Sequence, residues 1–245
     1  MQIDAVLLPG QRFDSWRSVC VVVDVLRASS SVVTLLSRGA SPIVAAADID
    51  EARALHVRLP SYLLCGEKDG LPPPGFHYGN SPSEFSRLNL DGKPAILATA
   101  NGTRILAELA DAPAVLVGCL LNRTAVAVAA IAIARERGLD IAVVCSAAYG
   151  GSTFVLEDAL GAGAIVDAAL SADPALNAAD AARFAADAFN MSCGDLIAAI
   201  ASADHAQQLE DAGLGEDVAY CSQLDTCHLA PLMERGKGGV LTLRA

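Results

Sequence analysis

Short runs of β-branched and other apolar residues alternate along the chain with stretches of helical periodicity. Residues 19–24 form an almost uniformly apolar run, which is typical of a strand buried on both faces of a sheet. Further strands are predicted at 42–46, 62–65, 95–98, 114–118, 141–145 and 240–243. Helices are predicted at about 29–39, 48–58, 103–110 and 123–137, with Gly138 ending the last of these. This alternation predicts an α/β fold.

Two segments interrupt the alternation. Residues 66–86 carry four glycines and four prolines without clear periodicity, so they are expected to form a long ordered loop of the kind that often binds ligands. Residues 154–215 are alanine-rich and almost wholly helical in pattern. A length of 245 residues allows one large domain or two smaller ones. We place a boundary near 120–140, which gives parts 1–125 and 126–245.

Composition narrows the class of protein. Hydrophobic residues make up 53% of the chain, which supports a sizeable core and excludes disorder for most of it. The net charge of −11 argues against nucleic acid or an anionic membrane as a partner, although local arginines can still bind a small anion. Seven cysteines without a C-x-x-C pair resemble reduced thiols. With no signal-like start and no apolar run of membrane length, we expect a cytoplasmic protein.

The first candidate site follows the apolar run at 19–24. Asp24 stands at the carboxyl end of that strand, where open α/β sheets place their ligands, and Arg27, Ser29 and Ser30 lead into a helix N-terminus. A carboxylate for a metal and a guanidinium with hydroxyls for a phosphate would then lie within one turn. The structural alternative is a capped helix in which Asp24 pairs with Arg27.

A second strand–turn–helix opening occurs at Thr99-Ala100-Asn101-Gly102-Thr103. Asn-Gly permits a tight turn and a threonine can cap the helix or donate to an anion, although such turns are common and the structural interpretation is favoured for this motif alone. Two openings of this type would face the same crevice. Glu67, just past another strand, can add a carboxylate to a metal site, or it can belong to a solvated turn.

The last candidate is the carboxylate pair Glu157 and Asp158, which precedes Gly161 and Gly163 in a helical pattern. Carboxylates near a helix start are favoured by the helix dipole even without function. Each glycine costs about 1 kcal/mol relative to alanine in a helix, so close packing against a neighbouring element is expected there.

Several phosphatase signatures are absent. Leu26 stands where a haloacid-dehalogenase-type motif needs a second aspartate, and Gly151 stands where a cysteine phosphatase has arginine. Neither a Walker A motif nor an Arg-His-Gly triplet occurs. The four histidines are scattered without ligand spacing and are interpreted as structural or surface residues.

Taken in series, the motifs resemble the 2-phosphosulfolactate phosphatase family. The residues that carry the likeness are 24–29 (Asp-Val-Leu-Arg-Ala-Ser), 66–68 (Gly-Glu-Lys), 79–82 (Gly-Asn-Ser-Pro), 99–103, Asn122 and 156–163, with a fainter continuation at 209–225. Two departures are Ala100, where the family commonly has threonine, and residues 146–152, which are looser than its usual glycine-rich stretch.

The resemblance implies two α/β parts with mixed sheets flanked by helices and a cleft between them. It also implies a magnesium-dependent hydrolase of 2-phosphosulfolactate, in coenzyme M biosynthesis, or of a related phosphorylated 2-hydroxy acid. The residues expected at the metal are Asp24, Glu67, Glu157 and Asp158, and those expected at the phosphate are Arg27, Ser29, Ser30, Lys68, Thr99, Asn101, Gly102 and Thr103. A homo-oligomer, most simply a dimer, is expected from the family.

The chemistry leaves alternatives open. Water can attack the phosphoryl group, or Asp24 can attack it and form an aspartyl phosphate. A rival from another class is a non-catalytic protein that senses a small phosphorylated or sulfonated acid.

Overall fold

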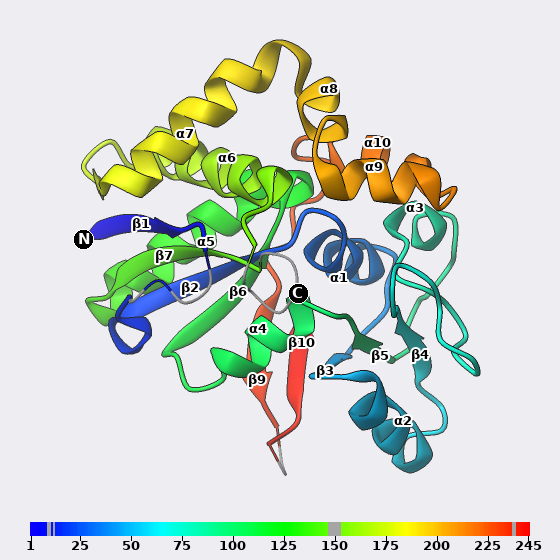
Figure 1. The fold of residues 1–245 in the computed structure, drawn as a ribbon. Coiled ribbons are helices and arrows are strands. Elements are labelled where there is room, and N and C mark those ends of the chain that lie inside the picture. Colours follow the sequence, from blue (N-terminus) through cyan, green and yellow to red (C-terminus); the bar gives the residue numbers. More distant parts are fainter. Residues whose placement is uncertain (9–10, 12, 147–152, 237–238) are drawn as a thin grey trace.

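The computed structural model describes residues 1–8, 11, 13–146, 153–236 and 239–245 (Figure 1). Within these residues ten strands form one mixed sheet flanked by helices, so the predicted α/β class is confirmed. The strands are β1 (Gln2–Val6), β2 (Ser18–Val23), β3 (Ile43–Ala46), β4 (Leu63–Gly66), β5 (Ala95–Ala98), β6 (Ala114–Gly118), β7 (Asp140–Cys145), β8 (Asn177–Ala178), β9 (Leu232–Arg235) and β10 (Leu241–Arg244). The helices are α1 (Ala28–Ser37), α2 (Ile49–Arg58), α3 (Pro82–Phe85), α4 (Gly102–Glu108), α5 (Arg123–Arg137), α6 (Leu156–Ala172), α7 (Asp180–Ser192), α8 (Leu196–Ala201), α9 (Asp204–Asp211) and α10 (Gly215–Cys221).

The sheet consists of two parallel groups joined by a hairpin. Its hydrogen-bonded order is β4-β5-β3-β10-β9-β6-β2-β7-β1-β8. The small group (β3, β4, β5) and the large group (β1, β2, β6, β7, β8) are each parallel internally. β10 pairs antiparallel with β3 and β9, and β9 pairs antiparallel with β6. Because three antiparallel pairings separate β3 from β6, the two groups run in opposite directions.

Alternation along β2 explains how both faces of the sheet are covered. Val19, Val21 and Val23 belong to the core formed with α5 and α6, whereas Cys20 and Val22 belong to the core formed with α1 and α4. Successive strand residues point to opposite faces, and every residue of β2 is buried. The uniformly apolar run predicted as a doubly covered strand is confirmed.

Local signals place several helix ends. The Asp48 side chain accepts from the Glu51 N–H at 2.8 Å and so begins α2. Gly138 ends α5 in the left-handed conformation, with a φ of +66°, as expected. The glycines of α6 pack closely, also as expected: a Cβ on Gly163 would lie 2.6 Å from the Ala185 carbonyl carbon of α7.

Other elements differ from the prediction. β1, β8 and β9 were not predicted, and the loop at 66–86 contains the single-turn helix α3. The long helical stretch is divided among α6 to α10, and β8 interrupts it. By length and composition alone, residues 180–211 could span a membrane, since an 18-residue window within them has a mean hydropathy of 1.2. In the structure these residues are divided among α7, the short 3-10 helix at 193–195, α8 and α9, and Figure 1 shows that α7, α8 and α9 follow different directions.

The predicted boundary at 125/126 does not separate two sheets. β7 comes from the second part, yet it lies between β1 and β2 of the first part and pairs with both. Division of the chain into two domains stays a prediction.

Candidate active site

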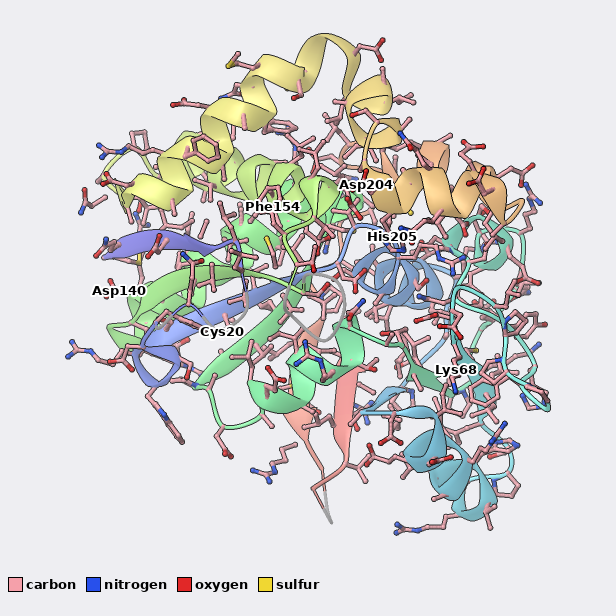
Figure 2. The ribbon with its side chains drawn as sticks, in the orientation of Figure 1. Cys20, Lys68, Asp140, Phe154, Asp204 and His205 are labelled. Carbon is pink, nitrogen blue, oxygen red and sulfur yellow. The ribbon has the colours of Figure 1, made fainter. Side chains whose placement is uncertain are left out.

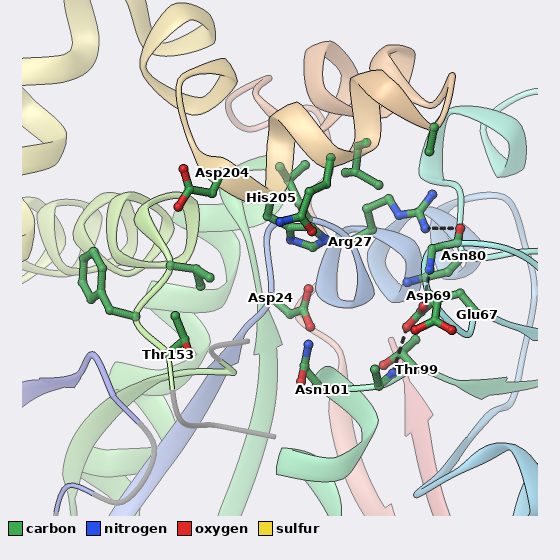
Figure 3. Close-up of a pocket in the computed structure, with 18 residues that line it drawn as sticks. Asp24, Arg27, Glu67, Asp69, Asn80, Thr99, Asn101, Thr153, Asp204 and His205 are labelled. Atoms are coloured by element: carbon green, nitrogen blue, oxygen red, sulfur yellow. Dashed lines mark hydrogen bonds between the residues drawn. The ribbon is translucent and has the colours of Figure 1, made fainter. Parts of the chain in front are cut away.

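A cavity of about 370 Å³ lies where the segments after β2, β4 and β5 meet α9 (Figure 3). Among the predicted residues that line it are Asp24 and Arg27 after β2, Glu67 after β4, and Thr99 and Asn101 after β5. The two strand–turn–helix openings therefore face one cavity, as predicted. Its lining residues fall at 24–101 and 153–212, so it draws on both predicted parts of the chain.

Asp24 is fixed at the centre of this arrangement. Its Oδ1 accepts from the Ala28 N–H at 2.9 Å, at the start of α1, and its Oδ2 lies 3.0 Å from the Ser146 hydroxyl. The carboxylate is buried, with 6% exposure. Figure 3 shows the side chains of Asp24 and Asn101 pointing toward one another across the cavity.

Asp158 lies against the same hydroxyl. Its Oδ2 is 3.1 Å from Ser146 Oγ, and its Oδ1 accepts from the Val25 N–H at 2.8 Å. Burial raises the pKa of Asp158 well above its usual range, and the charges of Asp24 and Glu157 raise it further. Burial likewise raises the pKa of Asp24, despite the hydrogen bond from Ala28. Since one hydroxyl can donate only one hydrogen, both contacts are hydrogen bonds only when one of the two carboxyl groups is protonated.

The third carboxylate, Glu157, contacts a histidine. Its Oε1 lies 3.1 Å from Nδ1 of His205 in α9, and its Oε2 is buried with no hydrogen-bond partner among the described residues. His205 lines the cavity, and Figure 3 shows it close to Asp24 and Arg27. Burial alone would lower the pKa of His205, but the hydrogen bond and charge of Glu157, with the charge of Asp24, raise the pKa on balance.

Arg27 pairs with Asp217 and not with Asp24, so the ion pair of the structural alternative is wrong, although Asp24 does bind the first N–H of α1 as that alternative expected. Its Nη1 donates to Asp217 Oδ2 at 2.9 Å, and its Nη2 donates to the Gly70 carbonyl oxygen at 2.9 Å. The guanidinium is buried, with 4% exposure, at the wall of the cavity. It is therefore a cation placed to face a small anion in that space.

Glu67 holds two loops together. Its Oε1 accepts from the Ala100 N–H and its Oε2 from the Gly70 N–H, each at 2.9 Å. Figure 3 shows Glu67 beside Thr99 and away from Asp24. Of the four predicted metal ligands, the structure brings Asp24, Glu157 and Asp158 together and sets Glu67 apart from them.

The predicted phosphate-binding residues fall into two sets. Asn101 and Thr99 line the cavity, and Gly102 packs so closely that a Cβ there would lie 2.7 Å from Asp24 Oδ2. Thr103 is buried, and its hydroxyl donates to the Thr99 carbonyl oxygen at 3.0 Å.

Ser29, Ser30 and Lys68, the other predicted phosphate ligands, are not among the described residues that line the cavity. The hydroxyls of Ser29 and Ser30 are buried inside α1, where they donate to the carbonyl oxygens of Val22 and Val25. They were expected to cap this helix, but it begins at Ala28, whose N–H binds Asp24 instead. Lys68 is exposed, away from His205 (Figure 2). Residues 147–152 of the looser segment lie outside the described residues.

Sequence reasoning missed three residues. His205 was interpreted as structural or surface, and Asp217 and Asn80 were noticed only as parts of family motifs. Asn80 is buried at the cavity wall, with an Oδ1 that has no hydrogen-bond partner among the described residues. For His205, the available signal was its place in the first turn of the short helix α9. A titratable side chain at such a position could have been considered a candidate site residue.

The carboxylates fit a magnesium ion in their donor chemistry, because Mg²⁺ prefers oxygen ligands. The unpartnered Oε2 of Glu157 and the carboxyl pair at Ser146 are oxygen atoms for which a cation would compensate. Among the described residues, no group of three or more His, Cys, Asp or Glu side chains is already arranged as a metal site. Mg²⁺ commonly keeps several waters and uses one or two carboxylates, so a complete protein cage is not required.

The sequence was compared with known proteins. A model of the 2-phosphosulpholactate phosphatase family matches residues 7–236. The chain belongs to this family. It is 36% identical over 238 residues to a probable 2-phosphosulfolactate phosphatase of Deinococcus radiodurans, covering 96% of this chain and 95% of that protein. It is likewise 36% identical over 232 residues to one of Pseudothermotoga lettingae, covering 94% and 95%.

The resemblance inferred from the motifs is thereby confirmed. A third relative, the probable 2-phosphosulfolactate phosphatase of Symbiobacterium thermophilum, is 33% identical over 224 residues, which cover 89% of this chain and 92% of that protein. This chain is an enzyme of the phosphoric monoester hydrolase class. The prediction of an enzyme rather than a non-catalytic sensor is confirmed.

Proposed function

We propose that this enzyme is a magnesium-dependent phosphatase that hydrolyses 2-phosphosulfolactate, or a related phosphorylated 2-hydroxy acid, to the free hydroxy acid and phosphate. One observation carries the proposal: the buried guanidinium of Arg27 and the buried carboxylate of Asp24 line the same cavity. A phosphate monoester needs cationic and N–H donors for its oxygens and a group that directs an attack at phosphorus.

Arg27 binds the phosphoryl oxygens in this mechanism. Its two described hydrogen bonds use two of five guanidinium N–H groups, which leaves donors for the substrate. The Asn101 side chain faces the same space and supports the orientation of the phosphoryl group. Binding and orientation of this kind can supply a large share of the rate enhancement in phosphoryl transfer.

Asp24 and Asp158, with Oε2 of Glu157, would hold the magnesium ion. The ion would supply charge neutralisation at the phosphoryl oxygens. Asp24 then either orients a water molecule or attacks phosphorus itself. In each case the bond between phosphorus and the ester oxygen breaks, that oxygen takes a proton, and water supplies the oxygen found in the released phosphate. His205, held at Nδ1 by Glu157, is placed to give that proton from Nε2.

A substrate panel tests the proposal. Release of inorganic phosphate is measured from 2-phosphosulfolactate, phospholactate and phosphoglycolate, in Mg²⁺ and in EDTA. We expect turnover only with Mg²⁺, and a loss of about a hundredfold or more for Asp24→Asn. The control is Asp180→Asn, a carboxylate whose side chain is 95% exposed. Full activity in EDTA, or in Asp24→Asn, would refute the proposal.

The nucleophile is tested separately. Rapid quenching of a reaction with ³²P-labelled substrate detects a phospho-enzyme if Asp24 attacks phosphorus, and Asp24→Asn abolishes that signal. Absence of label in a single turnover supports attack by water.

The proposal also covers the location, the oligomeric state and the pathway of the enzyme. We propose that the enzyme is cytoplasmic and a homodimer, and that it serves coenzyme M biosynthesis where the host makes that cofactor. Light scattering after gel filtration tests the dimer.

A further inference from the structure

The guanidinium of Arg27 is held from two sides by segments remote in sequence. Asp217 of α10, which is 190 residues further along the chain, accepts from Nη1 at 2.9 Å. The Gly70 carbonyl oxygen, in the loop after β4, accepts from Nη2 at 2.9 Å. A planar guanidinium bound at both terminal nitrogens cannot rotate without losing a charge-assisted hydrogen bond.

Asp217 is itself fixed. Its Oδ1 accepts from the Ser81 hydroxyl at 2.7 Å and from the Ser83 N–H at 3.0 Å, at the start of α3. The carboxylate is fully buried, with 0% exposure, and it is not among the described residues that line the cavity. It therefore contacts Arg27 from behind and leaves the side of Arg27 that faces the cavity free of this carboxylate.

The loop that carries Gly70 is braced in the same way. Glu67 binds the N–H groups of both Gly70 and Ala100, so the carbonyl oxygen that receives Nη2 of Arg27 has a fixed position. A cation fixed before substrate binds loses less conformational freedom on binding, which raises its contribution to affinity and rate.

We propose that Asp217 is a positioning residue for Arg27: it orients the guanidinium toward the phosphoryl group without touching the substrate. The inference rests on the proposed function in that it takes Arg27 as the anion-binding group. It assigns α10, which lies outside the cavity, a role in catalysis through its single buried carboxylate.

A double-mutant cycle tests this role. Asp217→Asn keeps the size of the side chain and removes its charge, and Arg27→Ala removes the group on which it acts. We expect Asp217→Asn to lower kcat/KM by about tenfold or more in the wild type, and by less than about twofold in the Arg27→Ala background. Equal losses in both backgrounds would overturn the proposal, because a purely structural role does not depend on Arg27.

The matched control is Glu216→Gln, which removes the neighbouring carboxylate. Glu216 is exposed and pairs with Arg87 at the surface, so its loss should leave kcat/KM unchanged. Unfolding measurements alone cannot separate the two roles, since Asp217→Asn leaves a buried unpaired guanidinium in either case.

A second readout separates this proposal from the proposed function. The affinity for inorganic phosphate, measured by calorimetry on the same four proteins of the cycle, needs no turnover. If no phosphate ester in the panel is hydrolysed but phosphate binding shows the coupling, the positioning role stands and the proposed function fails. If phosphate binding is uncoupled while hydrolysis is observed, the positioning role is wrong.

Should Asp217→Asn not fold, Ser81→Ala replaces it in the cycle. This variant removes one donor to Asp217 and keeps the carboxylate, so a smaller loss of kcat/KM is expected, again absent in the Arg27→Ala background. A loss that persists in that background would contradict the proposal.

Discussion

Oε1 of Glu157 lies 3.1 Å from Nδ1 of His205, and this contact joins the start of α6 to the start of α9. The ring is therefore held through Nδ1, and His205 lines the cavity. His205 also faces the opposing charges of Asp24 and Arg27, the first raising its pKa and the second lowering it.

The first prediction concerns the titration of His205. In metal-free protein we expect its pKa to lie above the ordinary value of about 6.5, so the imidazolium form persists to higher pH and is lost as pH rises through the folded-state pKa. NMR titration of the ring protons in EDTA measures it. Glu157→Gln removes the partner that raises the pKa, so burial should dominate and bring the pKa below 6.5. An unchanged pKa in that variant would show that Glu157 does not control the ring.

The second prediction concerns stability and pH. The pKa values of Asp24 and Asp158 are raised in the folded protein, so their contribution to stability is fully present below the unfolded value of about 3.9 and is lost as pH rises through the folded-state values. In EDTA, Asp158→Asn should therefore reduce the loss of unfolding free energy between pH 5 and pH 8. Urea titrations measure this, with the exposed Asp180→Asn as control. Equal pH dependence in all three proteins would contradict it.

The third prediction concerns the close approach of Gly102 to Asp24. A Cβ at this position would meet the Ala28 Cβ at the start of α1 and lie 2.7 Å from Asp24 Oδ2, so Gly102→Ala should displace both Ala28 and the carboxylate and lower kcat by about tenfold or more. Gly194→Ala is the control, because a Cβ there meets nothing within 4 Å. Steady-state assays on both variants provide the comparison, and wild-type kcat in Gly102→Ala would disprove the requirement for glycine.

The fourth prediction concerns packing remote from the cavity. In Gly163→Ala the new methyl group would meet the backbone of Ala185, and backbone atoms of a packed helix cannot move aside easily. We expect a loss of about 1–3 kcal/mol in unfolding free energy, with KM unchanged in the folded fraction. Gly194→Ala again serves as control in denaturant titrations. A stabilised Gly163→Ala would mean that α7 shifts without cost.

The elements with strong local signals were predictable from sequence. The apolar run of β2, the start of the helix predicted at 48–58 and the Gly138 stop each depend on residues close together in sequence, and the structure places those boundaries as expected. β1 and β9 were missed. β1 pairs with β7 and β8, which are far along the chain, so most of what holds it in the sheet is remote in sequence.

The site shows the same division. Asp24, Arg27 and Asn101 could be found because each follows a strand that ends at the cavity. His205 reaches the cavity, and Asp217 reaches Arg27 at its wall, only through the packing of α9 and α10, and no spacing along the sequence indicates that packing. The serines of α1 illustrate the reverse: their type suits an anion, but their hydroxyls point inward to carbonyl oxygens.

The hairpin of β9 and β10 has a consequence for biosynthesis. It lies between the small and large groups of strands. Its residues, 232–244, follow those of β1 to β8 in the chain, so a ribosome makes them after those eight strands. During translation the strands of each group can begin to pair with one another. The two groups can join into one sheet only when β9 and β10 are available to pair between them. Since Asp24 follows a strand of one group and Asn101 a strand of the other, the nascent chain should acquire a competent cavity only as synthesis of the hairpin is completed.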